Sequence, residues 1–244
     1  MMEENLCSVF PKDDDLFADC YTEEKAYEFC GHALKITQSF STDLGVAGVV
    51  WDSALVLCQY LDEQKISFCG RKVIELGAGT GIVGILAVLL GGNVTFTDLP
   101  HALQQIKSNV SVNVPSSCVH RLRVRALSWG HNHSQFPNDY DVVLGSDIVY
   151  LPETYPLLVQ TLQHLSAQRT TIYLSSKMRR EHGTVSFYEE ILPQHFRCQL
   201  LHRNEEANIN LYEVTQLEHC VGEHRLSQPG KAPQGPSPDS QSRL

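Results

Sequence analysis

Closely spaced glycines follow a short apolar segment near residue 77. Residues 73–84 read VIELGAGTGIVG, which is the pattern of a buried strand, a glycine-rich turn and the start of a helix. Because glycine has no Cβ atom, the backbone of such a turn can come close to a ligand at the carboxyl edge of a parallel sheet. The segment therefore predicts a ligand-binding turn, with a tight turn that binds nothing as the alternative.

Two acidic residues near this turn indicate which ligand it would hold. Residues 79–84 match the dinucleotide pattern G-x-G-x-x-G, but the carboxylate of Glu75 in the preceding strand would repel a pyrophosphate. A ligand with a cationic group would instead be attracted to Glu75. Asp98 follows the next expected strand, where an acid can accept hydrogen bonds from both hydroxyls of a ribose. Capping of the following helix is the alternative role of Asp98.

A carboxylate and a phenol follow another apolar segment. Residues 142–152 read VVLGSDIVYLP, so Ser146, Asp147 and Tyr150 come at the end of an expected strand. In a parallel sheet they reach the same edge as the glycine-rich turn. Such groups suit the placement of an amine nucleophile. The carboxylate can accept and so orient an N–H of the amine, and the phenol ring can form the wall of a channel. Turn capping by Asp147 and packing of Tyr150 on a helix are the structural alternatives.

Short β-type segments alternate with helical ones through most of the chain. Such alternation predicts right-handed crossovers and a mostly parallel sheet. The last two strands follow each other without a helix, which predicts an antiparallel pair at one edge. We expect an α/β fold with a Rossmann-like, doubly wound sheet of seven strands. The expected strands are residues 72–76, 94–97, 121–127, 141–144, 170–175, 196–201 and 209–214, and the expected helices are residues 51–61, 80–90, 101–112, 152–165 and 184–192.

The two ends of the chain differ in composition from its centre. Residues 1–30 hold nine acidic residues and two lysines, a net charge of −7 out of −9 for the whole chain. We interpret residues 1–25 as an acidic, flexible lead that could dock a basic partner. Residues 217–244 are rich in Pro, Ser and Gly and predict a disordered tail. The folded domain is expected at residues 26–216, and it begins with a hairpin and a helix.

Composition argues against several classes of function. The 19 basic residues against 28 acidic ones disfavour general binding to a nucleic acid backbone. The eight cysteines form no C-x-x-C pair, and no signal-peptide pattern is present at the start. The longest apolar stretch is far shorter than the roughly 20 residues that cross a bilayer. We expect a cytoplasmic monomer that binds neither nucleic acid nor a membrane.

Two polar clusters each have a simple explanation as solvated loops. His131-Asn132-His133 has no further metal ligand at a suitable spacing, so no metal site is expected. Lys177, Arg179 and Arg180 form a short basic cluster after the fifth strand. A lip that faces a substrate is the alternative for this basic cluster.

The motifs together resemble the seven-β-strand, S-adenosylmethionine-dependent methyltransferases of the protein-lysine group. The resemblance rests on the glycine string from Glu75 to Gly81, on Asp98, and on Asp147-Ile148-Val149-Tyr150, which matches an acidic-x-x-aromatic motif after the fourth strand. Further segments between about residues 9 and 214 are similar to members of the group that act on translation elongation factor 1-alpha. These segments include residues 50–52 (VWD), 126–130 (ALSWG), 176–179 (SKMR) and 192–196 (LPQHF).

The resemblance implies transfer of methyl groups from S-adenosylmethionine to a protein lysine, with elongation factor 1-alpha as the substrate. It implies that Asp147 and Tyr150 line the lysine channel as catalytic residues. The cofactor-binding residues, with Glu75 added by the charge argument, are Trp51, Glu75, Gly77, Ala78, Gly79, Asp98, Trp129 and Ser146. Ser146 replaces an alanine of the relatives, a change that a backbone contact tolerates. An Hsp70-type chaperone as substrate, a cofactor-binding protein without turnover and a dinucleotide-dependent dehydrogenase are the alternatives.

Overall fold

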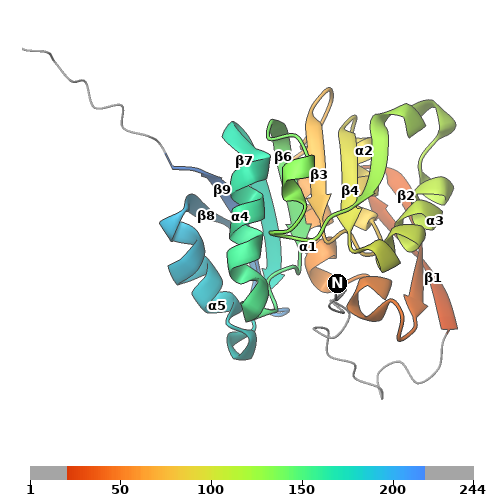
Figure 1. Ribbon diagram of the computed structural model, residues 1–244. Coiled ribbons are helices and arrows are strands. Elements are labelled where there is room, and N and C mark those ends of the chain that lie inside the picture. Colours follow the sequence, from red (N-terminus) through yellow and green to blue (C-terminus); the bar gives the residue numbers. More distant parts are fainter. Residues whose placement is uncertain (1–20, 218–244) are drawn as a thin grey trace, which may run out of the picture.

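The computed structural model describes residues 21–217, which form a seven-stranded sheet and a separate two-stranded hairpin (Figure 1). The strand order in the sheet is β5-β4-β3-β6-β7-β9-β8. All neighbouring strands from β5 to β7 are parallel, whereas β9 runs antiparallel to both β7 and β8. The strands are β3 Lys72–Leu76, β4 Asn93–Asp98, β5 Leu122–Ala126, β6 Tyr140–Ser146, β7 Ser166–Lys177, β8 Phe196–Asn204 and β9 Ile209–Gln216. The predicted fold class, including the antiparallel pair at one edge, is confirmed.

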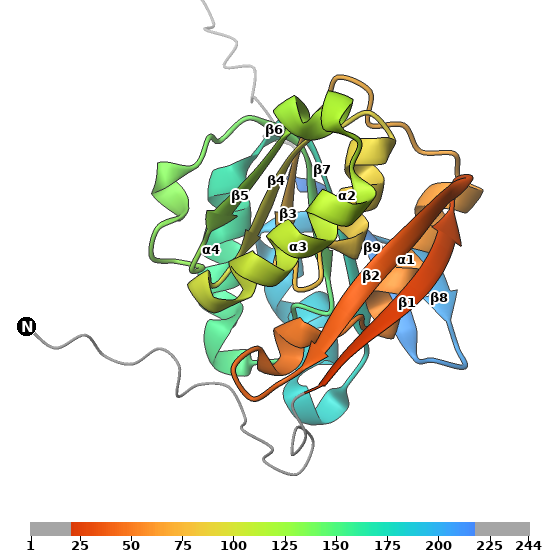
Figure 2. The same cartoon turned by 90° about the vertical axis from the view of Figure 1, so that its right-hand side faces the viewer.

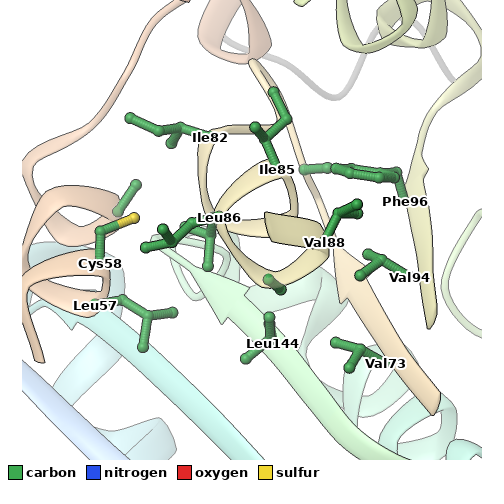
Figure 3. Packing of buried hydrophobic residues seen from close by; sticks show 14 of the residues in the cluster. Leu57, Cys58, Val73, Ile82, Ile85, Leu86, Val88, Val94, Phe96 and Leu144 are labelled. Atoms are coloured by element: carbon green, nitrogen blue, oxygen red, sulfur yellow. The ribbon is translucent and has the colours of Figure 1, made fainter. Parts of the chain in front are cut away.

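Helices cover both faces of the sheet because each strand places alternate apolar side chains on opposite faces. In β3, Val73 belongs to one buried cluster, whereas Ile74 and Leu76 belong to the other. The helices α1 Asp52–Glu63, α2 Ile82–Leu89 and α3 Leu103–Asn113 pack against the first face, and α4 Tyr155–Leu165 packs against the second (Figure 2). Figure 3 shows the first cluster, in which Leu57, Cys58 and Leu86 from two helices gather near Leu144 of the sheet.

The last predicted helix is helical throughout but changes its winding. It consists of α5 Thr184–Ser186, a π-helical turn over Phe187–Ile191 and a 3-10 turn over Leu192–Gln194. Phe187, Tyr188 and Leu192 of this segment are buried in the second cluster. The apolar spacing therefore predicted its position correctly, but not its form.

The hairpin is longer than the sequence indicated. It is formed by β1 Tyr21–Phe29 and β2 His32–Phe40, so residues 21–25, which were expected in the flexible lead, belong to a strand. The alternation was hidden because residues 21–26 are exposed on both faces. The rest of the expected lead, residues 1–20, and the expected tail from residue 218 onward lie outside the described residues.

The hairpin lies beside α3 (Figure 2), and two asparagines of this helix hold it against the domain. The Asn109 side chain accepts the Thr37 N–H at 2.9 Å and donates to the Thr37 carbonyl at 3.0 Å. Asn113 makes the same pair of bonds with Lys35, at 2.7 and 2.8 Å. Asn109 and Asn113 are four residues apart on the helix, and this rise is close to the length of the two-residue step from Thr37 to Lys35 on the strand. The side-chain amides therefore make the backbone hydrogen bonds that a neighbouring strand would otherwise make with β2.

The connections of the sheet change face between β3 and β6. The chain leaves β3 through α2 on one face and leaves β6 through α4 on the other. A crevice forms outside the carboxyl ends of the strands at such a switch point, and ligands of open α/β sheets bind there. The turns after β3 and β6 are the segments in which the sequence predicted ligand-binding and catalytic residues. Among the helices within residues 21–217, none is long and apolar enough to span a membrane.

Gly84 of α2 allows the helix to lie close to the sheet. A Cβ atom at this position would overlap the Glu75 carboxylate and the Phe96 ring, both of which are buried. We expect Gly84→Ala to lower the free energy of unfolding by about 1–3 kcal/mol, although alanine favours a helix by about 1 kcal/mol. Urea denaturation measures the effect. Ser108→Ala on the exposed face of α3 is the control, and an unchanged or raised stability of Gly84→Ala would show that the helix can move away.

Candidate active site

A cavity of about 810 Å³ opens at the carboxyl ends of the parallel strands. Its walls come from the loop between β2 and α1, from the turns after β3, β4, β5 and β6, and from the segment after β7. Nine of the ten site residues predicted from the sequence line it: Trp51, Gly77, Ala78, Gly79, Asp98, Trp129, Ser146, Asp147 and Tyr150. Glu75 is the exception. The structure thus brings together residues that span about a hundred positions of the chain.

The glycine-rich turn has a backbone that only glycine adopts without strain. Gly77, Gly79 and Gly81 all have positive φ angles, of 58°, 54° and 80°. A Cβ atom at Gly77 would lie 2.8 Å from the Ile148 side chain, and one at Gly79 would lie 3.2 Å from the Ala47 carbonyl oxygen. The turn is therefore packed between two other walls of the cavity, and its backbone forms part of the cavity surface.

Asp98 holds this turn from the neighbouring strand. One carboxylate oxygen accepts the Gly79 N–H at 2.7 Å, and the other accepts the Leu99 N–H at 2.7 Å. Burial raises the pKa of Asp98, and the two N–H donors act against that rise. Each oxygen retains a lone pair, so the carboxylate can accept further hydrogen bonds from a ligand in the cavity.

Glu75 lies beneath the turn and caps α2. It is 2% exposed, and its Oε2 accepts the Gly84 N–H at 3.1 Å. That N–H belongs to the first turn of the helix, where backbone donors have no partner within the helix. Glu75 does not line the cavity. The direct contact with a cationic ligand that its charge suggested is therefore replaced by support of the turn from behind.

The two tryptophans form walls of the cavity. Trp51 precedes α1, is 36% exposed, and donates from Nε1 to the Val46 carbonyl at 2.8 Å, which fixes the ring within its loop. Trp129 follows β5 and packs against the second apolar cluster. Its ring lies beside Gly77, at 3.7 Å from the place of a Cβ atom there. Both side chains are available to contact a ligand, so neither tryptophan is purely a core residue.

Asp147 has a strained backbone and a carboxylate that is bound through both oxygens. Its φ of 53° lies in the left-handed region, and its N–H donates to the Ser175 carbonyl at 2.7 Å. Arg179 binds the carboxylate in a fork, from Nη1 to Oδ1 at 2.8 Å and from Nη2 to Oδ2 at 2.9 Å. The Lys177 N–H also donates to Oδ1, at 3.1 Å. The left-handed residue thus turns a carboxylate into the cavity between β6 and β7.

Tyr150 lines the cavity together with the carboxylates of Asp98 and Asp147. Burial raises the pKa of its phenol, and the charges of Asp98 and Asp147 raise it further. The phenol therefore stays neutral at physiological pH and can donate or accept a hydrogen bond. Its backbone is fixed because the His182 ring bonds to the Tyr150 carbonyl at 3.0 Å.

Comparison with known proteins identifies the family. The model of a family described as lysine methyltransferase matches residues 28–192. An EEF1A lysine methyltransferase 3 from Xenopus tropicalis is 59% identical over 212 residues, which cover 86% of this chain and 94% of the relative. A protein N-lysine methyltransferase METTL21A from Danio rerio is 43% identical, over 78% of this chain and 86% of the relative.

The chain belongs to the lysine methyltransferase family. A solved structure of a 16S rRNA N2 G1207 methyltransferase from T. thermophilus has a TM-score of 0.61 at 16% identity, covering 82% of this chain and 52% of that chain. At this identity the likeness shows a shared fold only. The family membership makes the chain an enzyme of methyl transfer to lysine, and the dehydrogenase alternative is thereby removed.

Sequence reasoning missed three groups of this lysine methyltransferase. Arg179 was assigned to a basic cluster, but its spacing could not show that it pairs with Asp147. Of the wall loop, residues 42–51, only Trp51 was assigned to the site. The amides that anchor this loop were also missed: Gln105 donates to the Gly48 carbonyl at 2.8 Å, and the Gln38 side chain accepts the Val50 N–H at 2.8 Å. Only the position of Arg179 just after a strand end could have indicated that it faces the site.

The role of Glu75 as a cap can be tested through the pH dependence of stability. Burial raises the pKa of Glu75 well above its ordinary value, so the folded state binds the proton more tightly than the unfolded state. The wild-type protein therefore loses stability as pH rises from the unfolded pKa to the folded one. Glu75→Gln keeps an oxygen for the Gly84 N–H without the charge. We expect its free energy of unfolding, relative to wild type, to increase with pH by up to about 1.4 kcal/mol per unit.

Urea unfolding at pH 6, 7 and 8 measures this difference. The control is Glu28→Gln, which changes an exposed glutamate of β1 and should show no such trend. A Glu75→Gln variant that becomes less stable than wild type at pH 8 would show instead that the negative charge itself is needed to cap α2.

Proposed function

We propose that the protein methylates a lysine of elongation factor 1-alpha, with S-adenosylmethionine as methyl donor. The observation that carries the proposal is the cavity at the switch point, where the glycine turn, Asp98 and the Asp147–Tyr150 pair meet. The substrate is supported by two relatives named EEF1A lysine methyltransferase 3, from Xenopus tropicalis and Mus musculus, at 59% and 56% identity.

The residues of the cavity fit this methyl donor. The volume of about 810 Å³ lies within the usual range for small-molecule sites and leaves room for a lysine side chain beside the donor. The glycine turn, into which no Cβ atom fits at Gly77, allows close approach of the ligand to the backbone. We assign Asp98 the ribose hydroxyls, because each of its oxygens has a lone pair beyond the bonds to Gly79 and Leu99. We assign the remaining contacts to Trp51, Ala78, Gly79, Trp129 and Ser146, and assign Glu75 a supporting role through the turn.

The reaction needs placement more than acid or base catalysis. When bound, the donor supplies a methyl group on a positively charged sulfur, which needs no further activation. The substrate amine must lose its proton to water and present its lone pair to the methyl carbon. In our proposal the Asp147 carboxylate accepts an N–H of the amine, and the neutral Tyr150 phenol walls the channel. The apolar wall around them limits the access of water.

Asp98→Asn tests the cofactor site. The carboxylate accepts N–H bonds from Gly79 and Leu99 at once, whereas an amide offers one oxygen and turns an NH₂ group toward the other donor. We expect the affinity for S-adenosylhomocysteine, measured by calorimetry, to fall at least tenfold, or about 1.4 kcal/mol. Asp139→Asn, at the opposite edge of the sheet, is the control. Equal affinity of Asp98→Asn and wild type would remove Asp98 from the site.

Labelling of purified proteins tests the substrate and the role of Asp147. With tritiated S-adenosylmethionine, wild-type enzyme should label elongation factor 1-alpha on lysine, and Asp147→Ala should reduce the rate at least a hundredfold while binding S-adenosylhomocysteine normally. Mass spectrometry identifies the modified residue. Labelling of an Hsp70-type chaperone but not of the elongation factor would show that the chaperone is the substrate. An Asp147→Ala variant as active as wild type would refute the role of Asp147.

A further inference from the structure

The Asp147–Arg179 ion pair lies in the wall of the cavity that would receive the substrate lysine. Its side chains are 5% and 19% exposed, and both line the cavity. The guanidinium carbon of Arg179 lies 5.9 Å from the centre of the Trp51 ring, which is also a wall of the cavity. Among the described residues that line this cavity, Arg179 is the only lysine or arginine. The pair therefore sets the local charge where the substrate amine would enter.

Other charged and titratable groups around the pair do not duplicate this role. Glu181 faces Arg179, and Asp98 faces Tyr150. Burial raises the pKa of the Tyr150 and Tyr188 phenols, so both stay neutral beside Asp147. The remaining titratable residues that line the cavity are Asp43, His101, His131, Glu153 and His182. The two oxygens of Asp147 are bound by Arg179 and the Lys177 N–H.

The charge of this carboxylate matters because the nucleophile must be uncharged. A lysine amine has an ordinary pKa of about 10.4 and is mostly protonated in the cell. A lone carboxylate at hydrogen-bond distance would favour the ammonium form, which has no lone pair to attack with. A carboxylate paired in a fork with a guanidinium is nearly neutral as a unit, yet it still has an oxygen lone pair that can accept an N–H.

We propose that Arg179 is a positioning residue of the methyl transfer, which neutralises Asp147 so that the substrate lysine is held as the free amine. This inference rests on the proposed function. The ammonium proton leaves to water first. The nitrogen lone pair then forms the bond to the methyl carbon as the carbon–sulfur bond breaks, and its electron pair stays on sulfur. Arg179 acts on this step through the orientation and charge of Asp147, without touching the reacting atoms.

The experiment compares the pH dependence of single-turnover methylation in charge variants. The substrate is the purified elongation factor at saturating concentration, because the rate at saturation reports the ionisation of bound groups. In the pH–rate profile, the rising limb marks the pH at which the bound substrate amine loses its proton. We expect Arg179→Met to move this limb to higher pH by at least about one unit, because the variant leaves Asp147 unpaired. The KM for the protein substrate should not rise, because the ammonium form binds the free carboxylate.

Three further variants separate charge from structure. Arg179→Lys keeps the positive charge and should keep the limb close to that of wild type, even if its rate is lower. Asp147→Asn leaves Arg179 uncompensated and should move the limb to lower pH. The double variant Asp147→Asn/Arg179→Met removes both charges and should return the limb toward wild type. Arg180→Met, which changes the exposed neighbouring arginine outside the cavity, is the matched control.

Calorimetry with S-adenosylhomocysteine shows that each variant is folded. If Arg179→Met fails this check, the opposite shift expected for Asp147→Asn still tests the inference. Suppose that the wild-type enzyme is active but that the rising limb does not move in Arg179→Met or in Asp147→Asn. This result overturns the inference about Arg179 and leaves the proposed function intact. An equal shift in Arg179→Lys and Arg179→Met would show that geometry rather than charge is at work. A wild-type enzyme that labels no lysine overturns the proposed function itself.

Discussion

The site depends on one constrained segment, the glycine-rich turn between β3 and α2. The turn has three left-handed residues, and two carboxylates, one buried and one partly buried, fix it from different sides. Asp98 accepts the Gly79 N–H at 2.7 Å from the neighbouring strand, and Glu75 accepts the Gly84 N–H at 3.1 Å from below. Glu75 satisfies a backbone donor in the first turn of α2, which has no partner within the helix, and Asp98 satisfies a donor of the turn that precedes the helix. The acidic residues around the glycines thus stabilise the turn itself.

The same turn also fixes walls that are distant in the chain. Asn109 of α3 donates to the Thr80 carbonyl at 2.9 Å and to the Thr37 carbonyl of β2 at 3.0 Å. One amide therefore ties the turn to the hairpin, and Gln105 on the same helix ties the wall loop through Gly48. Since these donors and acceptors are largely buried, loss of one would leave an unpaired polar group in the core. The hairpin is in this way a structural part of the cavity.

The fold and most of the site followed from local patterns in the sequence. The apolar run from Val73 to Leu76, the glycines and the next apolar run define a strand, a turn and a helix without reference to the rest of the chain. Asp98, Asp147 and Tyr150 could be placed because the ends of parallel strands meet at one edge. Hairpin residues 21–25 could not be placed, since their side chains are exposed and carry no alternation.

What the sequence did not reveal are the contacts that depend on side-chain direction. The charge of Glu75 was read as facing the ligand, because the strand pattern does not show that this side chain points under α2. Arg179 was read as one of three basic residues, because only the left-handed turn at Asp147 and the end of β7 bring the two groups together. Attraction between opposite charges is not visible in spacing when the residues are 32 positions apart.

The two turns of the site solve the same physical problem in different ways. After β3, glycines adopt the left-handed conformation and leave the backbone bare for a ligand. After β6, Asp147 adopts it at some cost in strain, and the bonds to Arg179 and to the Lys177 and Ser175 backbones compensate for that cost. Asparagine and aspartate tolerate this conformation better than other side chains, because their short polar groups bond locally. The position therefore selects a residue that both makes the turn and carries an acceptor into the cavity.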